Sequence, residues 1–160
     1  MNKVILIFLI ILYTFSVKAH KNNPHGEEKK KTQKSYTSKS ILNNINKDYV
    51  ANIKPILIRS CGNCHNSERK MPWYYKIPGV KQLIDSDIRN ARKHLVLDND
   101  FPFGGHGSPA EDLKSIIATI KSGSMPPWRY RLMHSDAALS GKEKERIEDW
   151  VKKSLLKFKK

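Results

Sequence analysis

Both cysteines of this 160-residue chain lie in one short motif, Cys61-Gly62-Asn63-Cys64-His65. In a C-x-x-C-H pattern the two thiols can add across the two vinyl groups of a haem. The histidine that follows is then placed to coordinate the iron from one face. The motif therefore predicts a single covalently attached haem c, held by Cys61 and Cys64, with His65 as the proximal iron ligand.

Three other chemistries compete for the same motif. A structural zinc site needs four ligands, usually a second cysteine pair or a distant histidine pair, and the chain has no second cysteine pair. A thioredoxin-like redox pair expects a βαβ context, and strand signals are essentially missing here. A plain structural disulfide between Cys61 and Cys64 is the third alternative. Haem attachment is favoured because it uses both thiols and leaves none free in an oxidising compartment.

The opposite face of such a haem is open, bound by water, or closed by a methionine or histidine. Six side chains could occupy that position: Met71, Met125, Met133, His94, His106 and His134. Met125 fits best, because it lies 60 residues after His65, with room for two helices to carry the chain around the haem. The two prolines that follow it lack amide donors and lock φ, so a stiff, extended loop presents the thioether.

Alternatives to Met125 stay open at this point. Met125 could instead fill a core beside Trp128, as methionine often does, and one of the three histidines could be the distal ligand. Trp128 is expected to pack near the haem edge if Met125 is the ligand. The aromatic run Trp73-Tyr74-Tyr75 directly after the haem motif is expected to form a wall of the haem pocket.

Helical patterns surround these residues. Apolar residues recur at roughly helical spacing over 41–60, with an interruption at Pro55 that predicts a kink. A clearer apolar stripe over 80–95 predicts a second helix, and the glycine-rich stretch 99–107 predicts a loop.

Two capping boxes mark the remaining helices. Ser108 and Glu111 can cap a helix that begins at Pro109 and ends at Gly123. A second box predicts a last helix whose buried face is Ile147, Trp150, Val151 and Leu155. The expected fold is a small all-α domain.

The N-terminus predicts export. Residues 1–19 combine an early lysine, an apolar run and Val17-x-Ala19, which is the layout of a secretory signal peptide. The apolar run is shorter than a spanning helix normally needs, so an uncleaved membrane anchor is the weaker interpretation. Residues 20–40 are polar and lysine-rich, which predicts a flexible tether, and the haem-binding domain is expected over 41–160.

The chain carries a formal net charge of +15, with lysines gathered in the tether and the C-terminal tail. Such a surplus predicts an acidic protein partner or peripheral association with an acidic membrane surface through the tether or tail. Export to the periplasm makes nucleic acid the poorest partner. A solubilising role for these lysines is the plain alternative.

Three ordered stretches resemble the single-haem haem-binding domain proteins of bacteria, which are small exported relatives of cytochrome c. They are CGNCHNSERKMPWYYKIPGV, IRNARKHL and SGSMPPWRYRLMHSDAALSGKEKERIEDWV, and the resemblance extends over about 53–151. It implies a small cytochrome c-like helical domain wrapped around one haem c on Cys61 and Cys64. It also implies His65 as the proximal ligand and Met125 as the distal one.

An iron held by His65 and Met125 predicts a protein that transfers single electrons between redox partners, such as an acidic redox protein or a membrane respiratory complex. The alternative is a haem-based sensor or a small-ligand (CO, NO) binding protein with a displaceable distal ligand. Enzyme activity is not expected, because bacterial haem c peroxidases usually carry two attachment motifs and this chain has one.

Overall fold

The computed structural model describes residues 28–159, with side chains described from residue 38 onward. Within this range the chain forms six α-helices: α1 (Glu28–Asp48), α2 (Lys54–His65), α3 (Val80–His94), α4 (Pro109–Ser122), α5 (Trp128–Met133) and α6 (Gly141–Lys157). Three shorter helical turns are η1 (Tyr49–Ile53), η2 (Trp73–Lys76) and η3 (Ser135–Ala137). An isolated β-bridge, between Val96 and Gly104, pairs two extended backbone segments. The predicted all-α class is confirmed.

The first helix begins earlier than the predicted boundary at Ile41. It starts at Glu28, inside the segment 20–40 predicted as a flexible tether. Lysine, glutamate and glutamine are good helix formers, and neither proline nor glycine interrupts 28–48. The predicted signal peptide at 1–19 and residues 20–27 lie outside the described residues. None of the helices described is both long and apolar enough to span a membrane.

The predicted interruption near Pro55 takes the form of a π-helical turn. Residues Tyr49–Ile53 are wound as a π-helix between α1 and α2. Pro55 then lies in the first turn of α2, where a missing amide donor costs no intrahelical bond. This turn lets the chain run from α1 directly into the helix that ends at His65.

Both predicted capping boxes are present. The Ser108 side chain accepts from the Glu111 amide at the start of α4, and Ser140 does the same with Glu143 at the start of α6. Gly123 ends α4 with φ +66°, a left-handed conformation that glycine adopts without steric cost. These caps fix where α4 stops and where the loop carrying Met125 begins.

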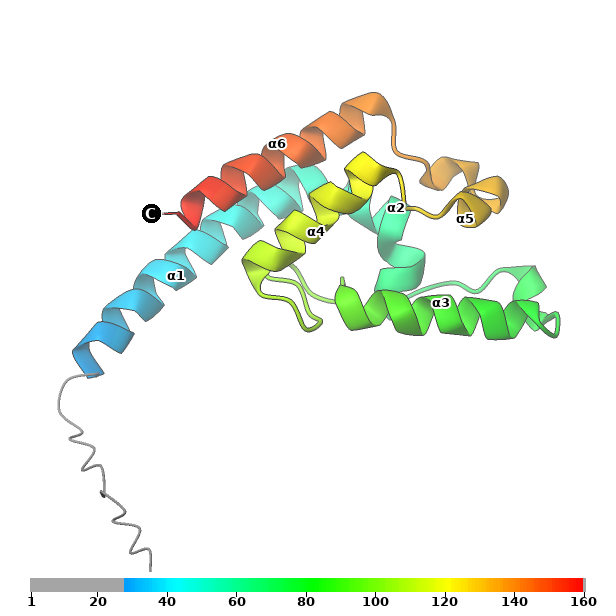
Figure 1. Ribbon diagram of the computed structural model, residues 1–160, viewed down its shortest axis with the longest axis horizontal. Coiled ribbons are helices and arrows are strands. Elements are labelled where there is room, and N and C mark those ends of the chain that lie inside the picture. The colour runs from blue at the N-terminus through cyan, green and yellow to red at the C-terminus, as the bar shows by residue number, and fades with distance from the viewer. Residues whose placement is uncertain (1–27, 160) are drawn as a thin grey trace, which may run out of the picture.

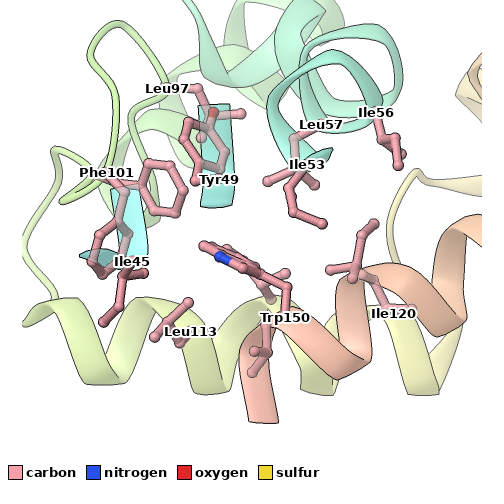
Figure 2. Close-up of a cluster of buried hydrophobic side chains, with 14 residues drawn as sticks. Ile45, Tyr49, Ile53, Ile56, Leu57, Leu97, Phe101, Leu113, Ile120 and Trp150 are labelled. Atoms are coloured by element: carbon pink, nitrogen blue, oxygen red, sulfur yellow. The ribbon is translucent and has the colours of Figure 1, made fainter. Parts of the chain in front are cut away.

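The hydrophobic core lies among α1, η1, α4 and α6 (Figure 2). Tyr49 packs edge-on against Phe103, with ring centroids 5.1 Å apart, and lies 5.7 Å from the Trp150 ring. The predicted face of α6 is mostly correct, since Ile147, Trp150 and Val151 are buried and Leu155 is half-buried. Ile56 and Leu57 of α2 belong to the same buried cluster, so the core fixes the position of α2.

Helix α3 lies at the opposite side of the molecule from α1 and α6 (Figure 1). It contacts α2 and η2, and none of its residues is fully buried. The predicted apolar stripe is therefore only partly covered by protein, and part of α3 faces the cavity described next.

Candidate functional site

A cavity of about 510 Å³ lies between α2, α3, α4 and the segment 125–130. Its volume falls in the range of cofactor and ligand pockets, roughly 300–1,000 Å³. Four predicted site residues line it together: Cys61, Cys64, His65 and Met125. The fold thus gathers on one cavity side chains that lie up to 64 positions apart in the sequence.

The last turn of α2 supplies three of these side chains. Positions i, i+3 and i+4 share one face of a helix, so Cys61, Cys64 and His65 point the same way. The two thiols are not joined in a disulfide. Burial raises the pKa of Cys61 to about 12 and also raises the pKa of Cys64, so both groups are neutral thiols near pH 7.

Neutral, buried thiols do not suit a thioredoxin-like redox pair. Redox-active cysteines act as thiolates and lie in surroundings that lower the pKa. Among the residues whose side chains the structure describes, 38–159, no group of three or more histidine, cysteine, aspartate or glutamate side chains could hold a metal ion. The zinc and thioredoxin-like interpretations of the motif therefore find no support in the geometry.

The imidazole of His65 is oriented by a backbone carbonyl. Its Nδ1–H donates to the carbonyl oxygen of Leu95 at 2.9 Å, which leaves Nε2 as the free, unprotonated nitrogen. Burial is the largest effect on the pKa of His65 and lowers it. The ring is therefore held as a neutral imidazole, the form in which histidine can bind a metal, and its hydrogen bond to a backbone carbonyl is typical of metal-ligating histidines.

The segment 95–98 is fastened to the end of the haem motif by further bonds. The Leu97 amide donates to the His65 carbonyl at 2.8 Å, and the Ser67 amide donates to Asp98 Oδ1 at 2.6 Å. Arg92 donates to both carboxylate oxygens of Asp98, at 2.9 and 2.8 Å. This pairing is the main reason that the pKa of Asp98 lies well below its usual range. We call these residues, 65–67 with 92–98, the His65 clasp.

Met125 reaches the cavity from the loop after α4. Pro126 and Pro127 line the cavity beside it, and Met125 itself is 37% exposed, so it lies at the cavity mouth rather than in the core. The proposed core role beside Trp128 is wrong, because Trp128 is 65% exposed and does not line the cavity. The expected packing of Trp128 near the haem edge is not seen for the same reason.

The other candidate distal ligands are placed less favourably. Met71, Met133, His106 and His134 do not line the cavity. His94 does line it, but it directly precedes Leu95, whose carbonyl holds His65, so it belongs to the side of the cavity from which His65 is held. A distal ligand must approach from the face opposite His65. Iron binding by Met125 stays a prediction.

The aromatic wall predicted after the haem motif is also misplaced. Trp73, Tyr74 and Tyr75 do not line the cavity, and Trp73 is 77% exposed. Tyr130 lines it instead, with Asn63 Nδ2 donating to its hydroxyl at 2.5 Å. The Tyr130 ring stacks on that of His134 at 4.3 Å. No local pattern around Tyr130 could have indicated its place on the cavity, because Asn63, which donates to its hydroxyl, is 67 residues away in sequence.

The cavity wall also contains two polar residues that the sequence did not indicate. Ser60 and Asp112 line the cavity, each is nearly fully buried, and neither Ser60 Oγ nor Asp112 Oδ2 has a hydrogen-bond partner among the described residues. Buried polar atoms without partners are uncommon and ask for an explanation. Together with two thiols, a free imidazole nitrogen and a thioether, they fit a cavity that takes a haem.

The chain was compared with known proteins. The model of the haem-binding domain family matches residues 7–153. Over 102 residues the chain is 31% identical to a cytochrome c peroxidase of Escherichia coli (strain K12). The match covers 62% of this chain and 22% of the peroxidase, so the chain spans about a fifth of that relative's length. No solved structure shows significant similarity to the chain.

The similarity to a peroxidase corrects one expectation. The single attachment motif predicted no enzyme activity, and the partial match to a cytochrome c peroxidase contradicts that prediction. The physical reason is that a count of haem motifs does not decide reactivity. Haem reactivity depends on the axial ligands and on access to the distal face.

Proposed function

The chain belongs to the haem-binding domain family, and from that premise we propose that it is an exported c-type haem protein that exchanges single electrons with redox partners. The observation that carries the proposal is the meeting of Cys61, Cys64, His65 and Met125 on one cavity. The haem would supply the redox chemistry. The chain supplies its attachment, ligation and shielding from water.

Each of these side chains has a distinct role in the proposal. Cys61 and Cys64 hold the haem covalently, so it stays bound in both oxidation states. His65 presents Nε2 because Leu95 fixes the tautomer and the ring plane. Met125 closes the other face and raises the reduction potential, as thioether ligands do.

Attachment outside the cytoplasm fits the signal-peptide pattern at 1–19, and we propose a periplasmic location on that basis. We also propose an acidic redox partner. Helix α5 lies at the cavity wall, and the side chains of Trp128, Arg129 and Leu132 on this helix are exposed. Exposed apolar groups beside the cavity, together with the net charge of +15 on the chain, favour a partner with acidic and apolar surface, and the association should weaken as salt rises.

Peroxide reduction is the second candidate, and the similarity to a cytochrome c peroxidase favours it. It requires that Met125 leaves the iron, or never binds it, so that peroxide can enter. The loop carrying Met125 is partly exposed at the cavity mouth, which makes such a movement compatible with the rest of the fold.

Exposure of the reduced protein to carbon monoxide separates the two candidates. A firmly bound Met125 predicts an unchanged visible spectrum for the unmodified protein and rapid binding in Met125→Ala. Met133→Ala is the matched control, because Met133 is exposed and away from the cavity. Rapid carbon monoxide binding by the unmodified protein, together with turnover of hydrogen peroxide, would favour the peroxidase over the electron carrier.

A further inference from the structure

The carboxyl group of Asp112 is the least explained group on the cavity wall. Asp112 lies in the first turn of α4, is 3% exposed, and lines the same cavity as His65 and Met125. Its Oδ2 has no hydrogen-bond partner among the described residues. Burying a carboxylate without a partner is costly, so a group in this position needs a compensating role or a proton.

The surrounding loop is fitted closely to this carboxyl. A Cβ atom at Gly107 would overlap Asp112 Oδ1, so a larger residue here would displace the carboxyl. The backbone amide of Asp112 is already used, since it donates to the Ser108 carbonyl at 2.9 Å. The carboxyl is therefore held in place by packing, and no ion pair with it is described within residues 28–159.

Few charged groups act on Asp112. Burial is the largest effect and raises the pKa of Asp112, Glu111 on the same helix raises it further, and His106 in the preceding loop lowers it. His94, at the end of α3, packs against His106 with ring centroids 5.4 Å apart. Helix α6 packs on α4 with an uncharged buried face: Ile147, Trp150, Val151 and Ser154. Of these surroundings only His106 favours the negative charge, and burial of the carboxyl outweighs it.

We propose that Asp112 is a redox-linked proton site, which binds one proton from solvent when one electron enters the haem cavity and releases it when the electron leaves. The inference rests on the proposed haem in this cavity. One electron and one proton enter together, so the net charge of the cavity is unchanged. In a low-dielectric interior an added electron attracts a proton to the nearest uncompensated carboxyl. Electron transfer by this protein is thus coupled to proton transfer.

The test is the reduction potential of the haem-loaded protein as a function of pH, for the native chain, Asp112→Asn and Asp87→Asn. For the native chain we expect the potential to fall as pH rises through the range in which Asp112 titrates, because burial raises the pKa of Asp112 above the ordinary carboxyl value of about 4. The slope should approach the tenfold-per-unit limit of about 59 mV. Asp112→Asn should flatten this slope. Asp87→Asn should keep it, because Asp87 also lines the cavity but pairs with Arg129 at 3.6 Å.

A second measurement uses the native protein alone, so it does not depend on whether a variant folds. In the infrared difference spectrum between reduced and oxidised native protein, we expect the carbonyl stretch of a protonated carboxylic acid to appear on reduction. A slope that persists in Asp112→Asn, or a native difference spectrum without that band, would overturn the inference and place any coupled proton elsewhere. A purified protein without haem would instead overturn the proposed function, and this inference with it.

Discussion

The Nδ1–H of His65 donates to the carbonyl oxygen of Leu95 across 2.9 Å. Thirty residues separate the two in sequence, and the His65 clasp brings them together. The bond decides which ring nitrogen is free, and it holds the ring at a fixed angle to α2. A residue that secures Leu95 therefore also acts on the electronic character of His65.

Asp98→Asn should loosen the clasp. The substitution removes the charge that Arg92 pairs with, so the carbonyl of Leu95 gains freedom and its bond to His65 weakens. A weaker bond makes the imidazole a poorer electron donor, and the reduction potential should rise. The free energy of unfolding should fall by about 0.2–1 kcal/mol, as for a partly exposed ion pair.

Asp85→Asn is the matched control, because Asp85 on α3 also forms an ion pair, with Lys81 at 2.6 Å, but lies outside the clasp. Its potential, measured by redox titration, should equal that of the native chain. Equal shifts in both variants would contradict a specific role for the clasp.

Removal of both thiols should abolish covalent haem. In the double variant Cys61→Ala, Cys64→Ala no thioether bond can form, so acid extraction should remove all haem and the polypeptide should show its unmodified mass. Each single variant should retain haem through one thioether. Haem that resists extraction from the double variant would contradict attachment through this motif.

Met125→Ala should lose the methionine-to-iron charge-transfer band at the red end of the oxidised spectrum. The reduction potential should fall, since a thioether raises it relative to other ligands. Met133→Ala should keep the native band, because that side chain is exposed outside the cavity. A native band in Met125→Ala would exclude Met125 as the ligand.

The stability of Asp112→Asn should depend on pH in a defined direction. Burial raises the pKa of Asp112, so its favourable contribution is complete below the unfolded pKa of about 3.9 and is lost as pH rises through the folded value. Relative to the native chain, the variant should thus gain stability on going from acid to neutral pH. The expected gain is about 1–3 kcal/mol, the cost of an unpartnered buried polar group, and urea titrations at several pH values measure it.

Gly105→Ala should destabilise the loop between α3 and α4. Gly105 has φ +118°, and an added Cβ would lie 2.9 Å from the carbonyl oxygen of His94. The expected cost is about 1–3 kcal/mol in thermal or urea unfolding. Gly141→Ala, at a position where a Cβ meets nothing within 4 Å, should be close to neutral. A neutral Gly105→Ala would show that this loop adjusts freely.

Local features were predictable from the sequence because each one is decided by neighbouring residues. The attachment motif, the two capping boxes and the helix end at Gly123 depend on spacings of a few residues. The two capping boxes and the helix end at Gly123 match the structure. The extension of α1 to Glu28 was missed because a polar composition was taken to indicate a tether, although the same residues favour helix.

Features that depend on tertiary contacts could not be predicted in this way. The carbonyl that holds His65, the hydroxyl of Tyr130 and the carboxyl of Asp112 reach the cavity only because α3, α4 and α5 close around α2. The aromatic run at Trp73 was placed on the wrong surface for the same reason. Proximity to the haem motif in sequence did not translate into proximity in space.

The mass of the purified protein, produced together with the machinery that attaches haem and then extracted with acidified acetone, tests the central claim most directly. Covalent attachment through Cys61 and Cys64 predicts a polypeptide heavier by one haem, with the added mass on the peptide that contains both cysteines. A polypeptide of unmodified mass, with all haem in the extract, would contradict the account.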